Sequence, residues 1–251
     1  AKKEKWAQGG AEFSTSLVRG ESSRVLVSEE PCDFEFDVHH GVHGHWNFAL
    51  EARRRELAQM IAKCGGTMLD AWSHAGQWGI RCAKLGATEV VLLEESLGFA
   101  RLCTDNVARN KVEAHCASLH RSNVVDELRN MASSGIRFNC VSLGLRARFE
   151  RYHKQRRGQY GRWFKPTLKG YENAVYLGAQ VTGRNGYLVV TFLLPLESEH
   201  WATSLVQNGL ERASRVGSIV FLATCVDEQS PLASSAMDDA WIPVVICVHL
   251  N

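Results

Sequence analysis

Hydrophobic and polar residues alternate with two periods along this chain, and the two periods predict strands and helices in turn. The apolar run at 187–194 is typical of a buried strand, whereas Leu50, Leu57 and Ile61 fall at helical spacing before a Gly65-Gly66 stop. Strands are predicted at 24–27, 34–38, 67–71, 90–93, 114–119, 140–143, 187–194, 218–225 and 242–249. Helices are predicted at 48–64, 77–85, 97–110, 124–132, 170–182 and 198–214.

This order of elements predicts an α/β fold with a mostly parallel seven-stranded sheet, helices on both faces and an antiparallel edge formed by the last strands. The chain has 251 residues, enough to bury a full core. Residues 1–31 mix charges with glycines and serines, so we expect an N-terminal extension there and one domain at 32–251. No run approaches eighteen apolar residues, and neither a spanning helix nor an uncleaved signal peptide is expected.

The stretch at 67–96, TMLDAWSHAGQWGIRCAKLGATEVVLLEES, predicts a βαβ half-site for a nucleotide-type ligand. One strand ends in Asp70, a turn of small residues surrounds Gly76, and the next strand ends on Glu94 and Glu95. Glycine lets the backbone approach a ligand closely, and a carboxylate at the strand tip accepts hydrogen bonds from both ribose hydroxyls. We therefore expect a pocket for an adenosyl group. The alternative is an acidic pair in a solvated turn or at the start of the next helix.

The turn itself, WSHAGQW at 72–78, narrows the ligand class. It lacks the G-x-G-x-x-G spacing that places a pyrophosphate at a helix N-terminus, so a nicotinamide or flavin dinucleotide is not expected. It resembles the S-adenosylmethionine motif of class I methyltransferases, and more narrowly the F-S-Y-T-G-x-F turn of the bacterial 23S ribosomal RNA cytosine-5 methyltransferases. The resemblance runs from about Phe34 to Leu250. It implies a Rossmann-like class I methyltransferase fold and S-adenosylmethionine as cofactor, with a vestigial pocket left open as an alternative.

The resemblance also implies which residues surround the cofactor. The family's ribose-binding acid maps onto Glu94, and its adenine-contacting Asp maps onto Asn123, which fits the N-cap of the following helix equally well. The family's G-F-Y-L-D-Q-R run maps onto NFALEAR at 47–53 and keeps Arg53. The cofactor-binding residues expected are Asp70, Ser73, Gly76, Glu94, Asn123 and Arg53.

Two motifs that carry the family's chemistry are replaced in this chain. The D-P-P motif maps onto Gly144, Leu145 and Arg146, and the cysteine of T-F-S-C-S maps onto Leu194. Cytosine-5 methylation needs a thiolate that attacks carbon 6 of the ring. We therefore assign no catalytic residue and expect a scaffold without the ancestral reaction. The alternative is methylation by positioning alone, assisted by Asp70, Glu51 or His74.

Most of the cationic excess lies in the basic segment at 144–169, which has nine Lys or Arg residues and one acid, whereas the rest of the chain has 20 basic and 26 acidic residues. The segment interleaves these cations with aromatic residues, a composition that suits RNA phosphates and unpaired bases. The alternative is a solvated loop whose aromatics fold back onto the domain. The RNA-binding residues expected are Arg146, Arg148, Arg151, Lys154, Arg156, Arg157, Arg162, Trp163 and Lys165.

Cysteines and histidines restrict the compartment and the metal chemistry. The eight cysteines lack C-x-x-C spacing, so we expect buried free thiols in a reducing compartment, either the cytoplasm or the mitochondrial matrix. The histidines at 39, 40, 43 and 45 lack cysteine partners and an H-E-x-x-H pattern, so we expect RNA contact there and no metal.

Together these features favour a degenerate rRNA-methyltransferase-like protein that binds RNA, most specifically rRNA or a ribosomal particle, in a structural or ribosome-assembly role. Ribosomal or assembly proteins are expected partners, and membrane or DNA is not. The first alternative is an active S-adenosylmethionine-dependent rRNA methyltransferase. The second is a small-molecule methyltransferase whose basic segment binds an anionic substrate.

Overall fold

The structure is a computed structural model that describes the backbone of residues 4–8, 11–15, 24–37, 50–64, 66–145, 160–195, 199–224 and 241–251. Within these ranges the side chains at 4–15, 37, 63–64, 160–168, 193–199, 224 and 241–243 are not described. None of the described helices is long and apolar enough to cross a membrane.

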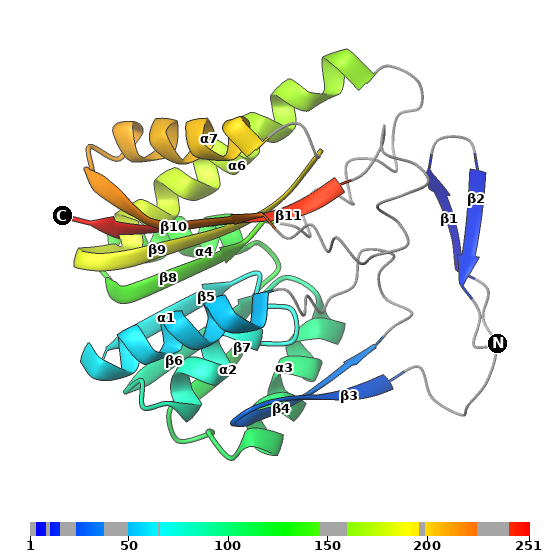
Figure 1. The fold of residues 1–251 in the computed structure, drawn as a ribbon, viewed down its shortest axis with the longest axis vertical. Helices are drawn as coiled ribbons and strands as arrows, with labels where there is room; N and C mark the ends of the chain where they lie inside the picture. The colour runs from blue at the N-terminus through cyan, green and yellow to red at the C-terminus, as the bar shows by residue number, and fades with distance from the viewer. Residues whose placement is uncertain are drawn as a thin grey trace.

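A seven-stranded sheet forms the centre of the molecule, in the order β10-β11-β9-β8-β5-β6-β7 (Figure 1). Five neighbouring strands are parallel, and β11 runs antiparallel to both β9 and β10. The predicted mostly parallel sheet with an antiparallel edge is therefore confirmed. The strands are β5 Thr67–Ala71, β6 Glu89–Glu94, β7 Cys116–His120, β8 Phe138–Gly144, β9 Thr182–Pro195, β10 Gly217–Thr224 and β11 Trp241–Leu250.

Helices cover both faces of this sheet because successive strand residues point to opposite sides and both sets are apolar. Leu69, Val190 and Val244 face a core shared with α4, α6 and α7. Their neighbours Met68 and Val189 face a second core shared with α1, α2 and α3. The helices are α1 Glu51–Cys64, α2 Gln77–Lys84, α3 Leu97–Asn110, α4 Val124–Ser133, α6 Tyr160–Val181 and α7 Glu199–Arg212.

One helix differs clearly from the prediction. Helix α6 begins at Tyr160, ten residues before the predicted start at 170, so its first turns carry part of the basic segment. Phe164, Leu168, Tyr171 and Val175 keep helical spacing across this region. The dense charges between them hid that period in the sequence.

Two antiparallel hairpins precede the sheet: β1 Glu4–Gln8 with β2 Ala11–Thr15, and β3 Arg24–Glu29 with β4 Cys32–Asp37. The β3–β4 hairpin is tied to α3, because the side chain of Asn110 bonds both backbone groups of Asp33, with N–O distances of 2.9 and 2.7 Å. Asn106 does the same for Glu35. The expected boundary between residues 31 and 32 falls in the turn of this hairpin, so the extension and the domain share it.

Candidate functional site

The turn between β5 and α2 has an unusual backbone. Trp72, His74 and Gly76 have φ angles of 57°, 53° and 78°. This left-handed backbone conformation is rare for residues other than glycine. At Gly76 a Cβ atom would also meet Ile80 Cδ1 at 2.6 Å. Strained turns of this kind cluster at ligand sites, and glycine at position 76 avoids both the cost of the left-handed conformation and the contact with Ile80.

This turn is bonded to the adjacent strand β6. The backbone N–H groups of Trp72 and Ser73 donate to Leu93 O at 2.8 and 3.3 Å, and Gly76 N–H donates to Ser73 O at 2.8 Å. These donors are satisfied inside the protein, so they do not form the row of free N–H groups that a phosphate needs. The geometry agrees with the missing dinucleotide motif.

Helix α3 holds the same turn from the other side. Cys103 Sγ donates to His74 O at 2.7 Å, and Asn106 Nδ2 donates to Ala75 O at 3.0 Å. Ser73 Oγ lies 3.5 Å from Cys103 Sγ and only 5% of Ser73 is exposed. The turn is therefore fixed by side chains of α3, and the Ser73 hydroxyl is directed into the protein.

Glu94, the expected ribose-binding residue, bridges the two strand-to-helix turns. Its Oε2 accepts from His74 N–H at 3.1 Å, and its Oε1 accepts from Glu95 and Ser96 N–H at 2.8 and 2.9 Å. Burial raises the pKa of this carboxyl, and the three N–H donors oppose that rise. Both lone pairs of Oε1 are used, whereas Oε2 keeps one. In this conformation Glu94 can accept one further hydrogen bond.

Asp70 is buried and caps α2. Its carboxylate accepts from Gly79 N–H at 3.1 Å and also from Trp78 N–H, which replaces the side-chain cap that Gly76 cannot supply. Burial raises the pKa of Asp70 from 3.8 to about 7. The geometry supports an indirect role in which Asp70 holds the helix start, and ligand contact by Asp70 stays a prediction.

Asn123 adopts the capping conformation that the sequence left open. Its Oδ1 accepts from Val125 and Asp126 N–H at 3.0 and 3.3 Å at the start of α4. Glu95 adds to the same helix start by accepting from Val124 N–H at 3.1 Å. The Asn123 amide nitrogen donates to Asp126 Oδ2 at 2.6 Å. An adenine contact through Asn123 stays a prediction.

Arg53 lies apart from these residues. Its guanidinium pairs with Glu56 at 2.8 Å and lies 5.2 Å from the ring centre of Phe221 on β10. Four strands separate β10 from β6 in the sheet, a distance of about 24 Å at the usual strand spacing. The structure therefore does not bring Arg53 to Glu94.

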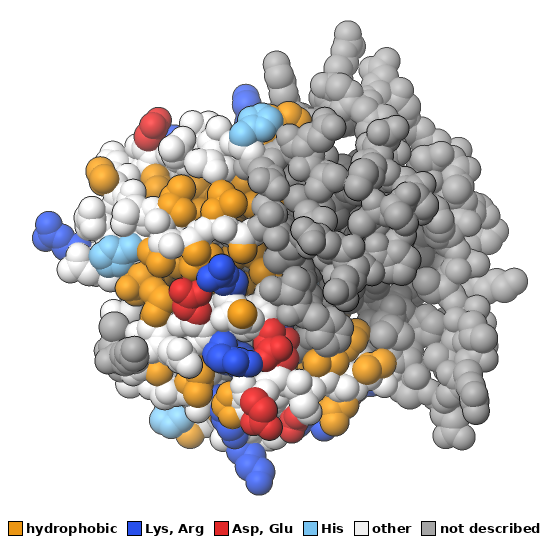
Figure 2. Space-filling view, in the orientation of Figure 1, with side chains coloured by type: hydrophobic (Ala, Val, Ile, Leu, Met, Phe, Trp, Pro, Cys, Tyr) orange, Lys and Arg blue, Asp and Glu red, His pale blue; other side chains and the backbone are white. Residues whose placement is uncertain are grey.

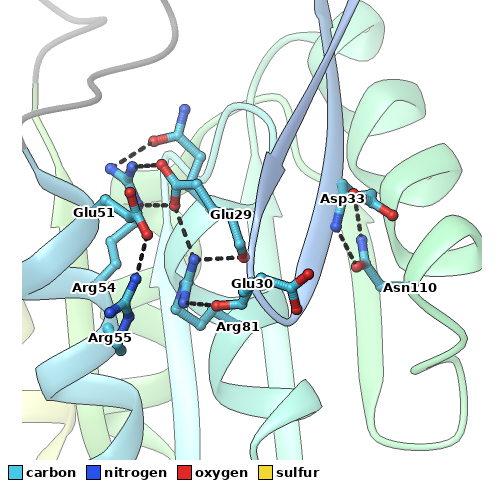
Figure 3. Close-up of polar contacts among 9 residues, drawn as sticks. Glu29, Glu30, Asp33, Glu51, Arg54, Arg55, Arg81 and Asn110 are labelled. Carbon is cyan, nitrogen blue, oxygen red and sulfur yellow. Dashed lines mark hydrogen bonds and ion pairs between the residues drawn. The ribbon is translucent and has the colours of Figure 1, made fainter.

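The neighbouring Arg54 belongs to a buried cluster that the sequence reasoning missed (Figure 3). Arg54 and Arg81 both donate to the Glu29 carboxylate, and Arg81 also donates to the backbone oxygens of Glu29 and Glu30 at 2.7 Å. Arg54 reaches Gln77 Oε1, at the start of α2, at 3.4 Å. The three charged side chains are at most 2% exposed. A charged residue on the apolar stripe of α1, between Leu50 and Leu57, was the available signal.

The place of the family's D-P-P aspartate is closely packed. A Cβ atom on Gly144, at the end of β8, would lie 2.5 Å from Trp72 O, a backbone atom of the candidate cofactor turn. No side chain fits there without a backbone shift. In β9 the backbone of Leu194 pairs with Ile242 of β11.

The described cysteines do not replace the missing nucleophile. Cys32, Cys82, Cys103, Cys116, Cys140 and Cys247 are free and buried. Burial raises the pKa of Cys32 to about 11 and those of Cys116 and Cys247 to about 12, and it raises the pKa values of Cys82, Cys103 and Cys140 well above the usual range. None of these six is a thiolate at neutral pH.

The expected RNA-binding residues lie outside the described residues or side chains. Residues 146–159 are not described, and at Arg162, Trp163 and Lys165 only the helical backbone of α6 is. The histidines at 39–45 also lie outside the described ranges. Among the described side chains, no group of three or more His, Cys, Asp or Glu residues could hold a metal ion.

Comparison with known proteins gives a fold and one curated relative, while no family model matches the chain. A Streptococcus mutans protein described as a SAM-dependent methyltransferase superposes with a TM-score of 0.71 over 94% of this chain and 58% of its own, at 11% identity. The tRNA m1G37 methyltransferase of M. jannaschii gives a TM-score of 0.63 over 96% of this chain and 61% of its own, also at 11% identity. The chain has the class I methyltransferase fold.

The curated relative is the ribosomal RNA large subunit methyltransferase I of Shigella flexneri serotype 5b, which is 24% identical over 182 residues. The match covers 72% of this chain and 43% of that protein, so the chain spans less than half of its relative. Another solved methyltransferase of this fold, SMU.776, was captured with SAH, at a TM-score of 0.67 and 13% identity over 93% of this chain and 58% of its own.

The residues present fit an adenosyl ligand at the candidate site in part. Gly76 gives the methyltransferase-type turn its left-handed backbone and leaves room for Ile80 and Leu92, and Glu94 Oε2 retains one acceptor position. The second acceptor that a ribose diol requires is occupied by two backbone N–H groups. A full two-hydroxyl contact needs the Glu94 carboxylate to rotate away from Glu95 and Ser96.

Proposed function

We propose that this chain is an RNA-binding protein of the class I methyltransferase fold that has lost the cytosine-5 methylation reaction. The observation that carries the proposal is the backbone contact at Gly144, where no side chain can replace the family's aspartate. S-adenosylmethionine would be held by Glu94 and by the turn at Gly76, and when bound it supplies an electrophilic methyl group. The chain's own residues fix the β5–α2 and β6–α3 turns, and the backbone of Trp72 leaves no room for a side chain at Gly144, the end of β8.

The cysteine chemistry supports the same conclusion. Cytosine-5 methylation requires a thiolate, and the raised pKa values keep all six described cysteines protonated at neutral pH. Leu194 stands where the family has its nucleophile. Free buried thiols also support a location in a reducing compartment, the cytoplasm or the mitochondrial matrix.

RNA as the partner is supported by the basic segment and by the relatives. The segment at 144–169 has a net charge of +8 and follows directly from the end of β8, at the same sheet edge as the cofactor turn. The curated relative acts on ribosomal RNA by its name, and a solved structure of the fold is a complex with tRNALeu. We therefore extend the proposal to rRNA or a ribosomal particle, in a structural or assembly role with ribosomal or assembly proteins.

The RNA proposal predicts a salt-dependent complex with a transcribed large-subunit rRNA fragment. The slope of log affinity against log salt is negative, and changing Arg156, Arg157 and Arg162 to Gln should reduce its magnitude by about 2. Each phosphate contact on a single strand contributes about 0.7 to that magnitude. The matched control changes Arg101, Lys111 and Arg129, all exposed, and should leave the slope near wild type. Equal slopes in both triple variants would remove the basic segment from the proposal.

An active RNA methyltransferase is the second candidate, favoured by the intact turn at Gly76 and the remaining acceptor on Glu94. Nitrogen or oxygen methylation through positioning needs no thiolate. The two candidates differ in labelled methyl transfer from S-adenosylmethionine to the rRNA fragment: we expect none, and incorporation would establish the enzyme.

Calorimetric titration with S-adenosylmethionine tests the cofactor site itself. We expect binding that weakens roughly 10- to 100-fold on Glu94→Gln, because a hydrogen bond to a charged acceptor is worth roughly 1.5–3 kcal/mol. The neighbouring Glu95→Gln variant keeps an acceptor for Val124 N–H and serves as the control. No heat at millimolar ligand would show a scaffold without a cofactor.

A further inference from the structure

We infer that a second RNA-binding surface lies at the opposite edge of the sheet, formed by Arg137, Arg184 and Arg215, and that it takes the phosphate backbone of the same RNA. This inference rests on the proposed RNA function. The three residues, called the arginine edge below, lie where β8, β9 and β10 begin: Arg137 directly precedes β8, Arg184 lies in the first residues of β9, and Arg215 lies just before β10. Each of these strands follows a helix, respectively α4, α6 and α7.

The parallel strands place this edge opposite the basic segment. Arg137 directly precedes β8, and Gly144 at the other end of β8 begins the segment. Six residue steps along a strand separate the two edges by about 20 Å. In Figure 1 the arginine edge lies at the left, beside the C-terminus, because Asn251 N–H donates to Val216 O. Figure 2 shows a Lys or Arg side chain projecting at this left-hand rim.

The arginines of this edge differ from most other described arginines in having no carboxylate partner. Ion pairs with Asp or Glu are formed by Arg24, Arg53, Arg54, Arg55, Arg81, Arg109, Arg121, Arg129 and Arg212. Within the described part of the chain, Arg137, Arg184 and Arg215 form no ion pair. Three positive charges thus gather without neutralisation, which is the arrangement that a polyanion favours.

Helix capping explains only part of this cluster. Arg215 donates to Thr182 and Gly183 carbonyls at 2.9 and 3.0 Å near the end of α6, where a cation is favoured. Arg137 uses one nitrogen on Ile136 O at 2.8 Å. Arg184 is exposed and bonds no described residue. Capping therefore fixes Arg215 in place and leaves Arg184 and most of Arg137 available.

The charges of the arginine edge also interact with one another. Partial burial lowers the pKa of Arg215, and the positive charges of Arg137 and Arg184 lower it further, with no carboxylate acting in the other direction. Two apolar side chains border the arginines, Ile136 at 46% and Val216 at 72% exposure. Such a surface offers cations for phosphates and apolar contact for sugars or bases.

The test measures the salt dependence of RNA binding by fluorescence anisotropy, with oligouridylate of about 40 nucleotides as probe. The double variant R137Q/R184Q keeps Arg215, which caps α6. It should reduce the magnitude of the salt slope by about 1.4, because two phosphate contacts that contribute about 0.7 each are lost. The single variant R184Q should lower it by about 0.7 and guards against a folding defect in the double variant.

The matched control is R101Q/K111Q, which removes the same charge from two exposed positions on and after α3. It should leave the slope unchanged. If R137Q/R184Q and R184Q both retain the wild-type slope, the arginine edge does not bind RNA, and an acidic protein segment becomes the better partner for it. If wild type binds no RNA at all, the proposed function fails as well, so the two failures are distinguishable.

Discussion

At the residue scale, two carboxylates that the sequence assigned to a ligand are bonded to the protein's own backbone. Asp70 caps α2 through Gly79 and Trp78, and Glu94 joins both strand-to-helix turns through three N–H groups. Each carboxylate lies at a strand end, as the sequence predicted. The hydrogen-bond partners of each carboxylate depend on its side-chain rotamer and on which backbone N–H groups the turn leaves unsatisfied. Neither can be inferred from the pattern of residue types along the sequence.

Asp70 makes stability depend on pH in a defined direction. The folded protein holds a proton on Asp70 up to about pH 7, whereas an unfolded chain loses it near 3.8. The free energy of unfolding should therefore fall as pH rises from about 4 to about 7, with an upper limit of about 4 kcal/mol. Glu94 contributes in the same direction, because its pKa is also raised.

Asp70→Asn keeps an acceptor for Gly79 N–H and removes the titration. We expect the variant to resemble wild type near pH 4, to be more stable near pH 8, and to have a flatter pH profile. Urea unfolding across that range measures this. Glu89→Gln, an exposed site at the start of β6, should keep the wild-type profile. A D70N profile as steep as that of wild type would show that Asp70 is not the titrating group.

At the element scale, the β3–β4 hairpin is joined to the rest of the domain by buried ion pairs in addition to apolar packing. Glu29 supplies one carboxylate to two buried guanidiniums, those of Arg54 in α1 and Arg81 in α2. Alternating apolar residues predicted both strands of this hairpin. Its attachment could not be predicted, because the three charged residues are separated by 25 and 27 positions and no local pattern links them.

Glu29→Gln should destabilise the fold by about 3–5 kcal/mol, since it leaves two buried arginines without a counter-charge. The measurement is the free energy of unfolding in urea. Glu30→Gln is the matched control: Glu30 is adjacent and exposed, and only its backbone oxygen contacts Arg81. Similar stabilities for the two variants would contradict an electrostatic attachment.

At the scale of the whole molecule, the order of elements was predictable because buried parallel strands and amphipathic helices have different periods. The seven strands of the sheet and its antiparallel edge followed from that alternation. The partition of charge followed only in part. Counting residues located the basic segment, whereas the arginine edge combines single residues at the starts of three strands and needs the sheet to bring them together.

The strand order also determines when the sheet can be completed. Strand β10 joins the sheet only through β11, which is later in the chain and inserts between β10 and β9. During synthesis from the N-terminus, β9 therefore keeps an unpaired edge, and β10 stays detached, until residues 241–250 have left the ribosome. Newly made chains pass through a stage in which two strand edges are open to incorrect pairing, and a chaperone that covers them would act at that stage.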